Sequence, residues 1–200
     1  MGSSGSGKST LLNILNGSQA PSFGRVLLNG RDIYQDDSFS SGLIGHIAQD
    51  DVLISELTVQ DNLRYSAALS LGDLDKSELH AAVDNTLRSL GLWDIRDLRV
   101  GSVMDKTISG GQRKRLNIAL ELIREPAVLF VDEPTSGLSS RDSEQFMDLL
   151  KELTLKGKLI FVVIHQPSSD IFKLFDHLLM LDAGGYPVFQ GNPLMSLAYF

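Results

Sequence analysis

Residues 2–10 read Gly2-Ser3-Ser4-Gly5-Ser6-Gly7-Lys8-Ser9-Thr10, and this stretch decides how the rest of the chain is interpreted. It completes the pattern Gly-x-x-x-x-Gly-Lys-Ser, and an apolar run over residues 11–15 follows, before Asn16 and Gly17. A glycine-rich loop that opens a short helix is the context that a phosphate-binding loop requires. Taken alone, the stretch could also be a flexible Gly/Ser leader.

The chemistry of such a loop explains its residues. Glycines let successive backbone N–H groups point at a phosphate chain, where a Cβ atom would clash. A helix that begins near Lys8 adds roughly half a positive charge at its N-terminus. The Lys8 ammonium can reach the β- and γ-phosphates, and the Ser9 hydroxyl can bind Mg²⁺. No strand precedes the loop in this sequence, so we expect the N-terminal strands to be partly missing and ATP binding by these residues to be weakened.

Composition excludes several classes of protein. Hydrophobic residues make up 42% and charged residues 22%, which is ordinary for a globular domain. The formal net charge of −7 argues against a general nucleic-acid-binding surface, but not against a nucleotide neutralised by Mg²⁺. Cysteine is absent, which excludes disulfides and thiolate metal sites. No apolar run approaches the roughly 18 residues of a membrane span. We therefore expect a soluble chain, with any membrane role carried by a partner or by another part of the polypeptide.

Residues 52–125 carry helix signals and no strand signal. Thr58 and Ser77 are the expected N-caps of two helices in this region. Consecutive helices inside an α/β chain are typical of an inserted subdomain. We expect one domain, in which residues 1–51 and 126–200 form an α/β core and residues 52–125 form a helical subdomain.

Short apolar runs predict three buried strands of the core, at residues 43–48, 127–131 and 159–164, with a polar loop at 36–41 before the first. Ligands of open α/β sheets bind beyond the carboxyl ends of the strands. Polar residues that follow these strands are therefore candidate site residues. They are Gln49, Asp132, Glu133 and His165.

A second candidate phosphate site is Ser109-Gly110-Gly111-Gln112, at the start of a further predicted helix. A helix N-terminus with glycines can bind a phosphate as the first loop does. One chain cannot easily present both helix ends to one nucleotide. We expect Arg113-Lys114-Arg115, which follow, to lie on a solvated helix face rather than to form a nucleic-acid patch.

Each motif alone has an ordinary structural explanation, but their order along the chain resembles the nucleotide-binding domains of ATP-binding-cassette (ABC) transporters. In chain order, the resembling motifs are the Walker A loop at 2–10, the Q-loop at Gln49, the signature at 108–115, the Walker B strand at 128–133 and the switch histidine at His165. Residues 132–138 and 164–169 and the Arg-Lys-Arg run resemble the G-type (White-like) subfamily. In that group the ATPase domain precedes its membrane domain on one polypeptide.

The resemblance implies a P-loop NTPase core of the ABC type and an ATPase coupled to transmembrane transport. It implies that Glu133 acts as general base on the attacking water and that His165 contacts the γ-phosphate. Gln49 would sense Mg²⁺ and the attacking water, and Mg²⁺ would be held by Ser9, Gln49 and Asp132. The implied ATP-binding residues of the first loop are Gly2, Ser3, Gly5, Gly7, Lys8, Ser9 and Thr10.

The resemblance also implies partners. Ser109, Gly110, Gly111 and Gln112 would act in trans, on ATP bound by a second ATPase domain in a head-to-tail homodimer or pseudo-symmetric dimer. A transmembrane permease domain, separate or on the same full-length polypeptide, would place this domain at the cytoplasmic side of the membrane. No nucleic acid partner is expected. One departure is Ser139, where the family usually has Asp.

Two alternatives stay open. The first is a soluble ABC-type ATPase not coupled to transport. However, chromosome proteins carry a long coiled coil where this chain has about a hundred residues between Lys8 and Ser109, and ribosome-associated types carry two cassettes. The second is an inactive, truncated fragment of an ABC ATPase. Small-molecule kinases share only the phosphate loop and lack Ser-Gly-Gly-Gln.

Overall fold

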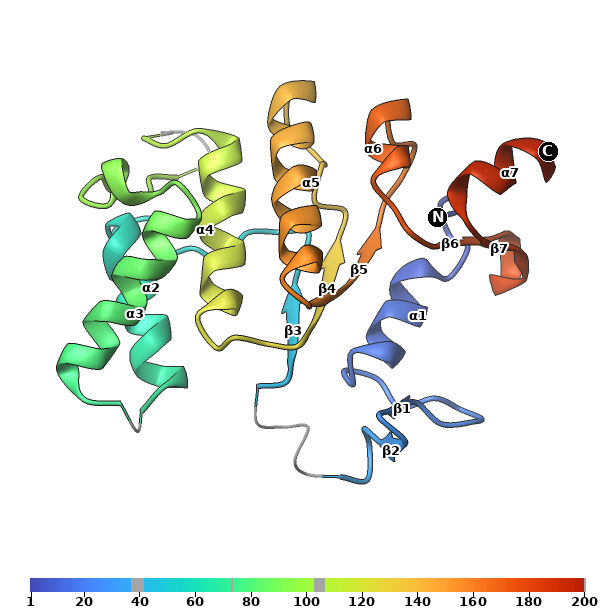
Figure 1. Ribbon diagram of the computed structural model, residues 1–200, viewed down its shortest axis with the longest axis horizontal. Helices are drawn as coiled ribbons and strands as arrows, with labels where there is room; N and C mark the ends of the chain where they lie inside the picture. The colour runs from blue at the N-terminus through green and yellow to red at the C-terminus, as the bar shows by residue number, and fades with distance from the viewer. Residues whose placement is uncertain (37–41, 73, 103–106, 200) are drawn as a thin grey trace.

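A parallel sheet of three strands, in the order β3-β4-β5, lies at the centre of the fold. The computed structural model describes residues 1–36, 42–72, 74–102 and 107–199, so the polar loop expected at 36–41 lies almost wholly outside the described residues (Figure 1). The strands are β3 (Ile44–Ile47), β4 (Val128–Asp132) and β5 (Leu159–Val163). The first four residues of β4 are buried because the strand is central, as its continuous apolar run predicts.

Helices cover both faces of this sheet, and the alternation of side chains along β4 shows how. Leu129 and Val131 belong to the main hydrophobic core, which also contains residues of α4 (Gly110–Leu122) and α5 (Ser140–Leu155). Val128 and Phe130 point the other way and form a smaller core with Leu12 of α1 (Lys8–Leu15). The helix after the phosphate loop and the helix of the second glycine motif therefore lie on opposite faces (Figure 1).

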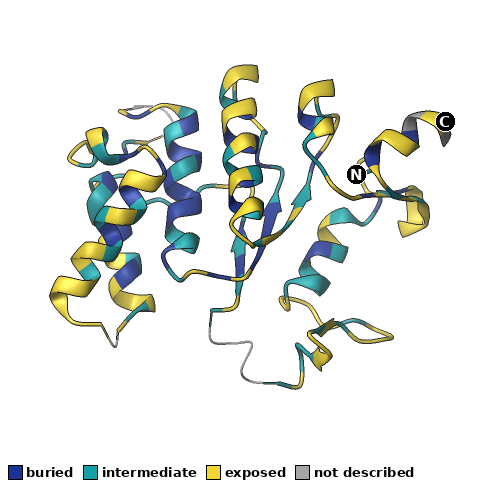
Figure 2. Cartoon of the chain, viewed as in Figure 1, coloured by how far each residue is buried: buried dark blue, intermediate teal, exposed yellow. Residues whose placement is uncertain are grey.

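Two helices of the middle region pack on α4, and a short 3-10 helix packs on the second of them. They are α2 (Val59–Ser70), α3 (Lys76–Ser89) and the short 3-10 helix η2 (Trp93–Ile95). Their buried residues continue the main core without a break, as the dark blue positions in Figure 2 indicate. The proposed limits of a helical subdomain at residues 52 and 125 stay predictions.

The two N-caps expected in this region have different outcomes. Thr58 caps α2, as predicted, by accepting a hydrogen bond from the Asp61 N–H. Ser77 does not cap α3, because Asp75 takes that place and forms a capping box with Glu78. A carboxylate near a helix N-terminus also interacts favourably with the helix dipole, which a serine hydroxyl does less well.

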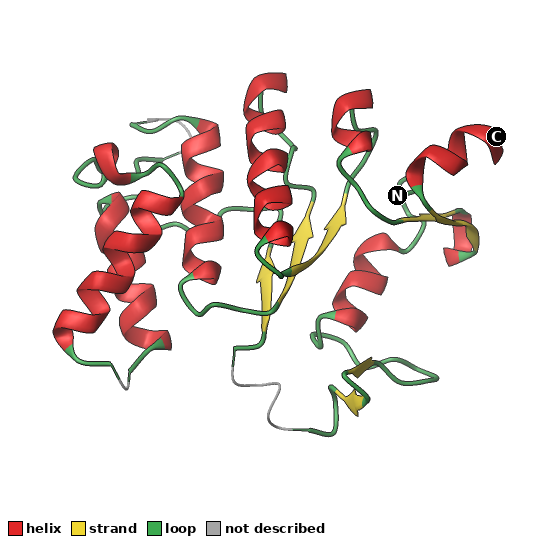
Figure 3. Ribbon diagram, viewed as in Figure 1, coloured by secondary structure: helices red, strands yellow, loops and turns green. Residues whose placement is uncertain are grey.

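Smaller elements surround the sheet (Figure 3). A small hairpin is formed by β1 (Leu27–Leu28) and β2 (Arg31–Asp32). Gly2 forms a parallel bridge with Leu181 of β6. The remaining elements are α6 (Ser169–Lys173), β6 (Leu178–Leu181), η3 (Ala183–Gly185), β7 (Pro187–Gly191) and α7 (Pro193–Tyr199), with β6 and β7 antiparallel.

The strand β5 is less buried than its sequence predicts. Leu159 is 51% and Phe161 40% exposed, although the apolar run 159–164 predicts a fully buried strand. Among the described residues β5 pairs with β4 alone, and the side away from β4 faces a cleft of about 500 Å³. Residues of α1, β5 and β6 line this cleft. The exposure follows because a sheet-edge strand is covered on one side only.

Candidate active site

The phosphate loop ends at Gly7, whose φ of +82° makes it a left-handed N-cap of α1. A side chain is rarely tolerated in that conformation, so the chain can turn into the helix here because the residue is glycine. The Lys8 ammonium folds back over the loop and donates to the carbonyls of Gly2 (3.0 Å) and Ser3 (2.7 Å). Its charge therefore lies where the loop would receive a phosphate.

Asp132, the last residue of β4, faces this loop. The Ser9 hydroxyl lies near the Asp132 carboxyl group. Burial, followed by the neighbouring Glu133 charge, raises the pKa of Asp132, and the charge of His46, the Ser9 hydroxyl and the charge of Lys8 partly offset this rise. The Asp132 Oδ1 atom is buried and has no hydrogen-bond partner among the described residues.

These features fit a Mg²⁺ ion. Mg²⁺ takes oxygen ligands and is typically held by one or two protein groups together with substrate phosphates. Asp132 and Ser9 supply two such oxygen groups beside the phosphate loop, and the unpaired Oδ1 is a buried acceptor that an ion would satisfy. No group of three or more His, Cys, Asp or Glu residues that could hold a metal occurs within the described ranges. The phosphates of the nucleotide would therefore complete the coordination.

Glu133 follows Asp132 in a strained backbone conformation. Its φ is +43°, which non-glycine residues seldom adopt, and its N–H donates to the Val163 carbonyl at 2.9 Å. Such strain costs about 1–3 kcal/mol and gathers at functional sites. Glu133 and His165 line the same cleft of about 470 Å³, so the structure brings these two predicted residues together.

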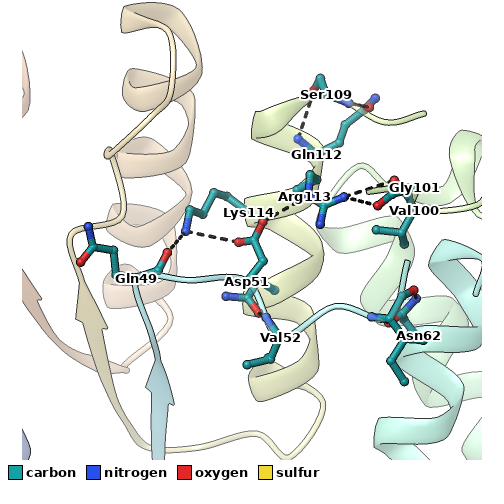
Figure 4. Close-up of polar contacts among 12 residues, drawn as sticks. Gln49, Asp51, Val52, Asn62, Val100, Gly101, Ser109, Gln112, Arg113 and Lys114 are labelled. Atoms are coloured by element: carbon teal, nitrogen blue, oxygen red, sulfur yellow. Dashed lines mark hydrogen bonds and ion pairs between the residues drawn. The ribbon is translucent and has the colours of Figure 1, made fainter. Parts of the chain in front are cut away.

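Gln49 reaches the same edge of the sheet by a different route. β3 pairs in register with β4, so that Ile47 lies beside Val131, and Gln49 is the second residue after β3. Gln49 is exposed, and its backbone carbonyl accepts a hydrogen bond from the Lys114 ammonium. Figure 4 shows its side-chain amide pointing away from Lys114.

The second glycine motif forms a well-defined helix start. Ser109 is the N-cap of α4, and its hydroxyl accepts from the Gln112 N–H at 3.2 Å. In return, the Gln112 side chain accepts from the Ser109 N–H at 2.8 Å, which completes a capping box. Gly111 is buried against α5, since a Cβ atom at this position would lie 2.8 Å from Oδ1 of Asp142.

The predicted site residues thus fall into two groups. The phosphate loop, Asp132, Glu133 and His165 gather at the carboxyl edge of the sheet, and Gln49 follows the neighbouring strand there. Residues 109–112 lie with α4, which packs on the face of the sheet opposite α1. The roles assigned to the individual residues stay predictions.

The expectation that Arg113-Lys114-Arg115 lie on a solvated helix face is wrong for Arg113 and Lys114, whereas Arg115 is half-buried. Arg113 and Lys114 are buried, and both form ion pairs with Asp51, at 3.2 Å from Arg113 Nε and 3.3 Å from Lys114 Nζ. Sequence reasoning passed over Asp51, although one signal was available. Charged residues in a helix that is flanked by other core elements need partners, and Asp50 and Asp51 follow the nearest predicted strand.

Fold and site together define a class of protein. A glycine-rich loop opens a helix on one face of a parallel sheet, and an acidic pair follows the central strand. This combination is that of a P-loop nucleotide-hydrolysing domain.

Comparison with known proteins narrows the class. Residues 1–136 match the family model described as ABC transporter. ABC transporter G family member 28 of Arabidopsis thaliana is 44% identical over the whole chain, which covers 18% of that protein. The rat broad substrate specificity ATP-binding cassette transporter ABCG2 is 41% identical over the whole chain, 30% of its length. The solved structure of cbiO1 from Clostridium perfringens, part of the ABC transporter complex cbiONQ, has a TM-score of 0.86 at 30% identity, covering 99% of this chain and 77% of that one.

The chain belongs to the ABC transporter family, and it has the fold of an ABC ATPase domain. The resemblance to G-type transporters that the motifs indicate is confirmed by the relatives. The chain spans less than a third of the length of these curated relatives. Within the described residues, no helix has both the length and the apolar character that crossing a membrane demands.

Proposed function

We propose that this domain binds and hydrolyses ATP with Mg²⁺ and that hydrolysis drives transport by a membrane permease domain. The observation that carries the proposal is the grouping at the sheet edge of Lys8, Ser9, Asp132 and Glu133. Phosphoryl transfer needs positioning and charge neutralisation more than covalent chemistry, and this set supplies both.

Each of these residues has a defined task. Lys8 and the N–H groups of the phosphate loop bind the phosphates, and the Lys8 bonds to loop carbonyls are exchanged for bonds to phosphate oxygens. Asp132 and Ser9 would hold Mg²⁺, which would supply charge neutralisation on the phosphates. Glu133 takes a proton from the attacking water, and His165, in the same cleft, contacts the γ-phosphate.

The placement of α1 and α4 supports a dimer. Their N-termini belong to helices on opposite faces of the sheet, so the Ser109 motif of one chain is poorly placed to reach its own phosphate loop. A head-to-tail pair of domains allows each motif to bind the ATP of the other. Two ATP molecules are then enclosed between the domains, and their hydrolysis lets the domains separate. The pair thus alternates between a closed and an open state, and this alternation can drive transport. The permease holds this domain at the cytoplasmic side of the membrane.

Turnover by the full-length protein that contains this chain tests the proposal. We expect Mg²⁺-dependent ATP hydrolysis, lost with Lys8→Ala and reduced about 10²- to 10⁴-fold with Glu133→Gln. The Glu133→Gln protein is expected to bind ATP normally and to accumulate as a nucleotide-bound dimer. Glu144→Gln is the matched control, because Glu144 is exposed on α5 and does not line the cleft.

The possible results separate the alternatives. Hydrolysis without any effect on transport in vesicles supports an uncoupled ABC-type ATPase instead. A full-length protein that binds no ATP, or hydrolyses it equally well with Glu133→Gln, contradicts the proposed function.

A further inference from the structure

One face of α4 carries polar residues at four-residue spacing, which places them in a row along the helix. Each of them contacts the chain between residues 46 and 52, which comprises the end of β3 and the loop after it. The contacts are Arg113 Nε to Asp51 Oδ2 (3.2 Å), the Val52 N–H to Asn117 Oδ1 (3.4 Å) and the His46 N–H to Glu121 Oε2 (3.3 Å). The loop that carries Gln49 is therefore attached along the length of this helix.

The strongest part of this attachment is the Asp51 cluster, formed by Asp51, Arg113 and Lys114 (Figure 4). The side chains of Arg113 and Lys114 are each only 9% exposed, and that of Asp51 is 20% exposed. Lys114 Nζ lies 3.3 Å from Asp51 Oδ1 and donates to the backbone carbonyl of Gln49. One lysine thus binds both the acid and the residue two positions before it.

The two cations of the cluster divide their donors between Asp51 and backbone carbonyls. Arg113 Nη1 donates to Gly101 (2.7 Å) and to Val100 (3.3 Å), while Asp51 Oδ1, although ion-paired with Lys114, accepts no hydrogen bond from the described residues. The bonds to carbonyls therefore fix two backbone segments against α4, the loop at 49–51 and the chain at 100–101. Hydrogen bonds from charged donors are roughly twice as strong as neutral ones, and they are directional.

Stability alone does not explain such a cluster. Taking three charges out of water is costly, and well-packed apolar residues of similar volume often serve stability as well or better. What apolar residues cannot do is hold particular carbonyl oxygens at fixed positions. The cluster is therefore better explained by the geometry it imposes than by the stability it adds.

We propose that Asp51, Arg113 and Lys114 are positioning residues that couple Gln49 to the helix beginning at Ser109. This inference rests on the proposed ATPase function, and it concerns three residues to which the proposed function assigned no role. Because Gln49 and Ser109 are held to one rigid helix, the loop after β3 and the N-terminus of α4 move together. A shift of Gln49 on nucleotide binding is then passed to the motif that faces the partner domain.

Enzyme kinetics of the full-length protein provide the first test. Lys114→Met keeps the length of the side chain but removes its charge and its bond to Gln49, and Asp51→Asn removes the anion. We expect each to lower kcat for ATP about tenfold to a hundredfold, because misplacing a reacting group by about 1 Å has effects of this size. KM for ATP is expected to stay within about threefold, since the cluster packs against α4 and, among the described residues, makes no contact with the phosphate loop or with α1, which lies on the other face of the sheet. Lys114→Arg, which keeps charge and donor, is expected to restore most of kcat.

Lys158→Met is the matched control. Lys158 also donates to a backbone carbonyl, that of Pro126, at 2.7 Å, but this carbonyl precedes β4 and lies at the opposite end of the strand from Asp132. If Lys158→Met lowers kcat as much as Lys114→Met, the effect reflects general loss of a buried hydrogen bond, and the proposal is overturned.

Amide hydrogen exchange tests the linkage without relying on activity. In Lys114→Met, amides of residues 49–54 are expected to exchange about tenfold faster. In the wild type this loop can open only if the bonds of Lys114 break, and in the variant those bonds are already absent. Amides of β4 are expected to keep the wild-type rate. Unchanged exchange at 49–54, or equal acceleration throughout the chain, overturns the inference. If the wild-type protein does not hydrolyse ATP, but Lys114→Met still accelerates exchange at residues 49–54, the proposed ATPase function is contradicted and the linkage between Gln49 and α4 is supported.

Discussion

Gly111 and Asp142 are in direct contact: a Cβ atom on Gly111 would lie 2.8 Å from Oδ1 of Asp142, closer than real Cβ contacts allow. Gly111→Ala therefore requires Asp142 to move, and turning its carboxylate is not enough, because Cβ of Asp142 would also lie only 3.3 Å from the new atom. We expect this change to lower the free energy of unfolding by about 1–3 kcal/mol, as overpacking does. Urea denaturation of the 200-residue chain measures it.

The neighbouring glycine is the control for this contact. A Cβ atom on Gly110 would lie 3.3 Å from Leu138 Cδ2, the end of a flexible side chain that can move. Alanine is favoured over glycine in helices by up to about 1 kcal/mol, so Gly110→Ala is expected to be neutral or stabilising. Equal effects of the two substitutions would show that the Asp142 contact is not decisive.

Ser139 is the N-cap of α5, and its hydroxyl both accepts from the Asp142 N–H (3.1 Å) and donates to Asp142 Oδ2 (2.8 Å). The residue that departs from the family pattern thus still caps its helix. Ser139→Ala is expected to lower the free energy of unfolding by about 1 kcal/mol, the usual value of an N-cap. Thermal denaturation followed by circular dichroism measures this change.

Replacing Ser139 with the usual family residue has a different expected outcome. Asp is as good an N-cap as Ser, but Ser139→Asp puts a second carboxylate against Asp142 in place of a donor. We expect Ser139→Asp to be less stable than Ser139→Asn at pH 7, with the gap narrowing in high salt because salt screens the repulsion. Equal stability of the two variants at low salt contradicts this explanation.

Features that depend on local spacing were predictable from sequence. The phosphate loop needs only residues 2–10, and the apolar run before Asp132 is enough to predict a central strand. Asp132, Glu133 and His165 each follow a predicted strand, so their place at the end of the sheet could be expected without knowing any contact between side chains. Their positions could be predicted because the length of an apolar run determines which residues reach the end of a strand, while their roles stay predictions.

Features that depend on distant partners were not predictable. Arg113 and Lys114 can be buried because Asp51, far away in the sequence, forms ion pairs with both. The spacing of residues along one helix does not reveal a partner in another part of the chain. The exposure of Phe161 likewise depends on what covers the edge of β5, and not on the apolar run that contains it. The N-cap of α3 depends on a choice between two nearby residues, Asp75 and Ser77. Asp75 is the N-cap because Glu78, three residues later, completes a capping box with it.

Phe130 and Phe161 stack across β4 and β5, with ring centroids 4.9 Å apart and planes 7° from parallel. Phe130 is 2% and Phe161 40% exposed, so the two rings lose different amounts of burial when removed. We expect Phe130→Ala to cost about 3–5 kcal/mol and Phe161→Ala about 1–2 kcal/mol in urea denaturation. The double variant should show a coupling of about 0.5–1.5 kcal/mol from the lost stacking. Additive effects would mean that the stacking contributes nothing.

Glu133 is held at a φ of +43°, a conformation that glycine and asparagine adopt more readily than glutamate or glutamine. If function rather than folding requires glutamate here, relieving the strain must stabilise the chain while hydrolysis is lost. We expect Glu133→Gly and Glu133→Asn to be more stable than Glu133→Gln by about 1 kcal/mol in urea denaturation, with hydrolysis strongly reduced in all three. At Glu144, inside α5, the order must reverse, because glycine costs about 1 kcal/mol in a helix interior. A Gly variant that is less stable than the Gln variant at both positions would contradict stored strain at Glu133.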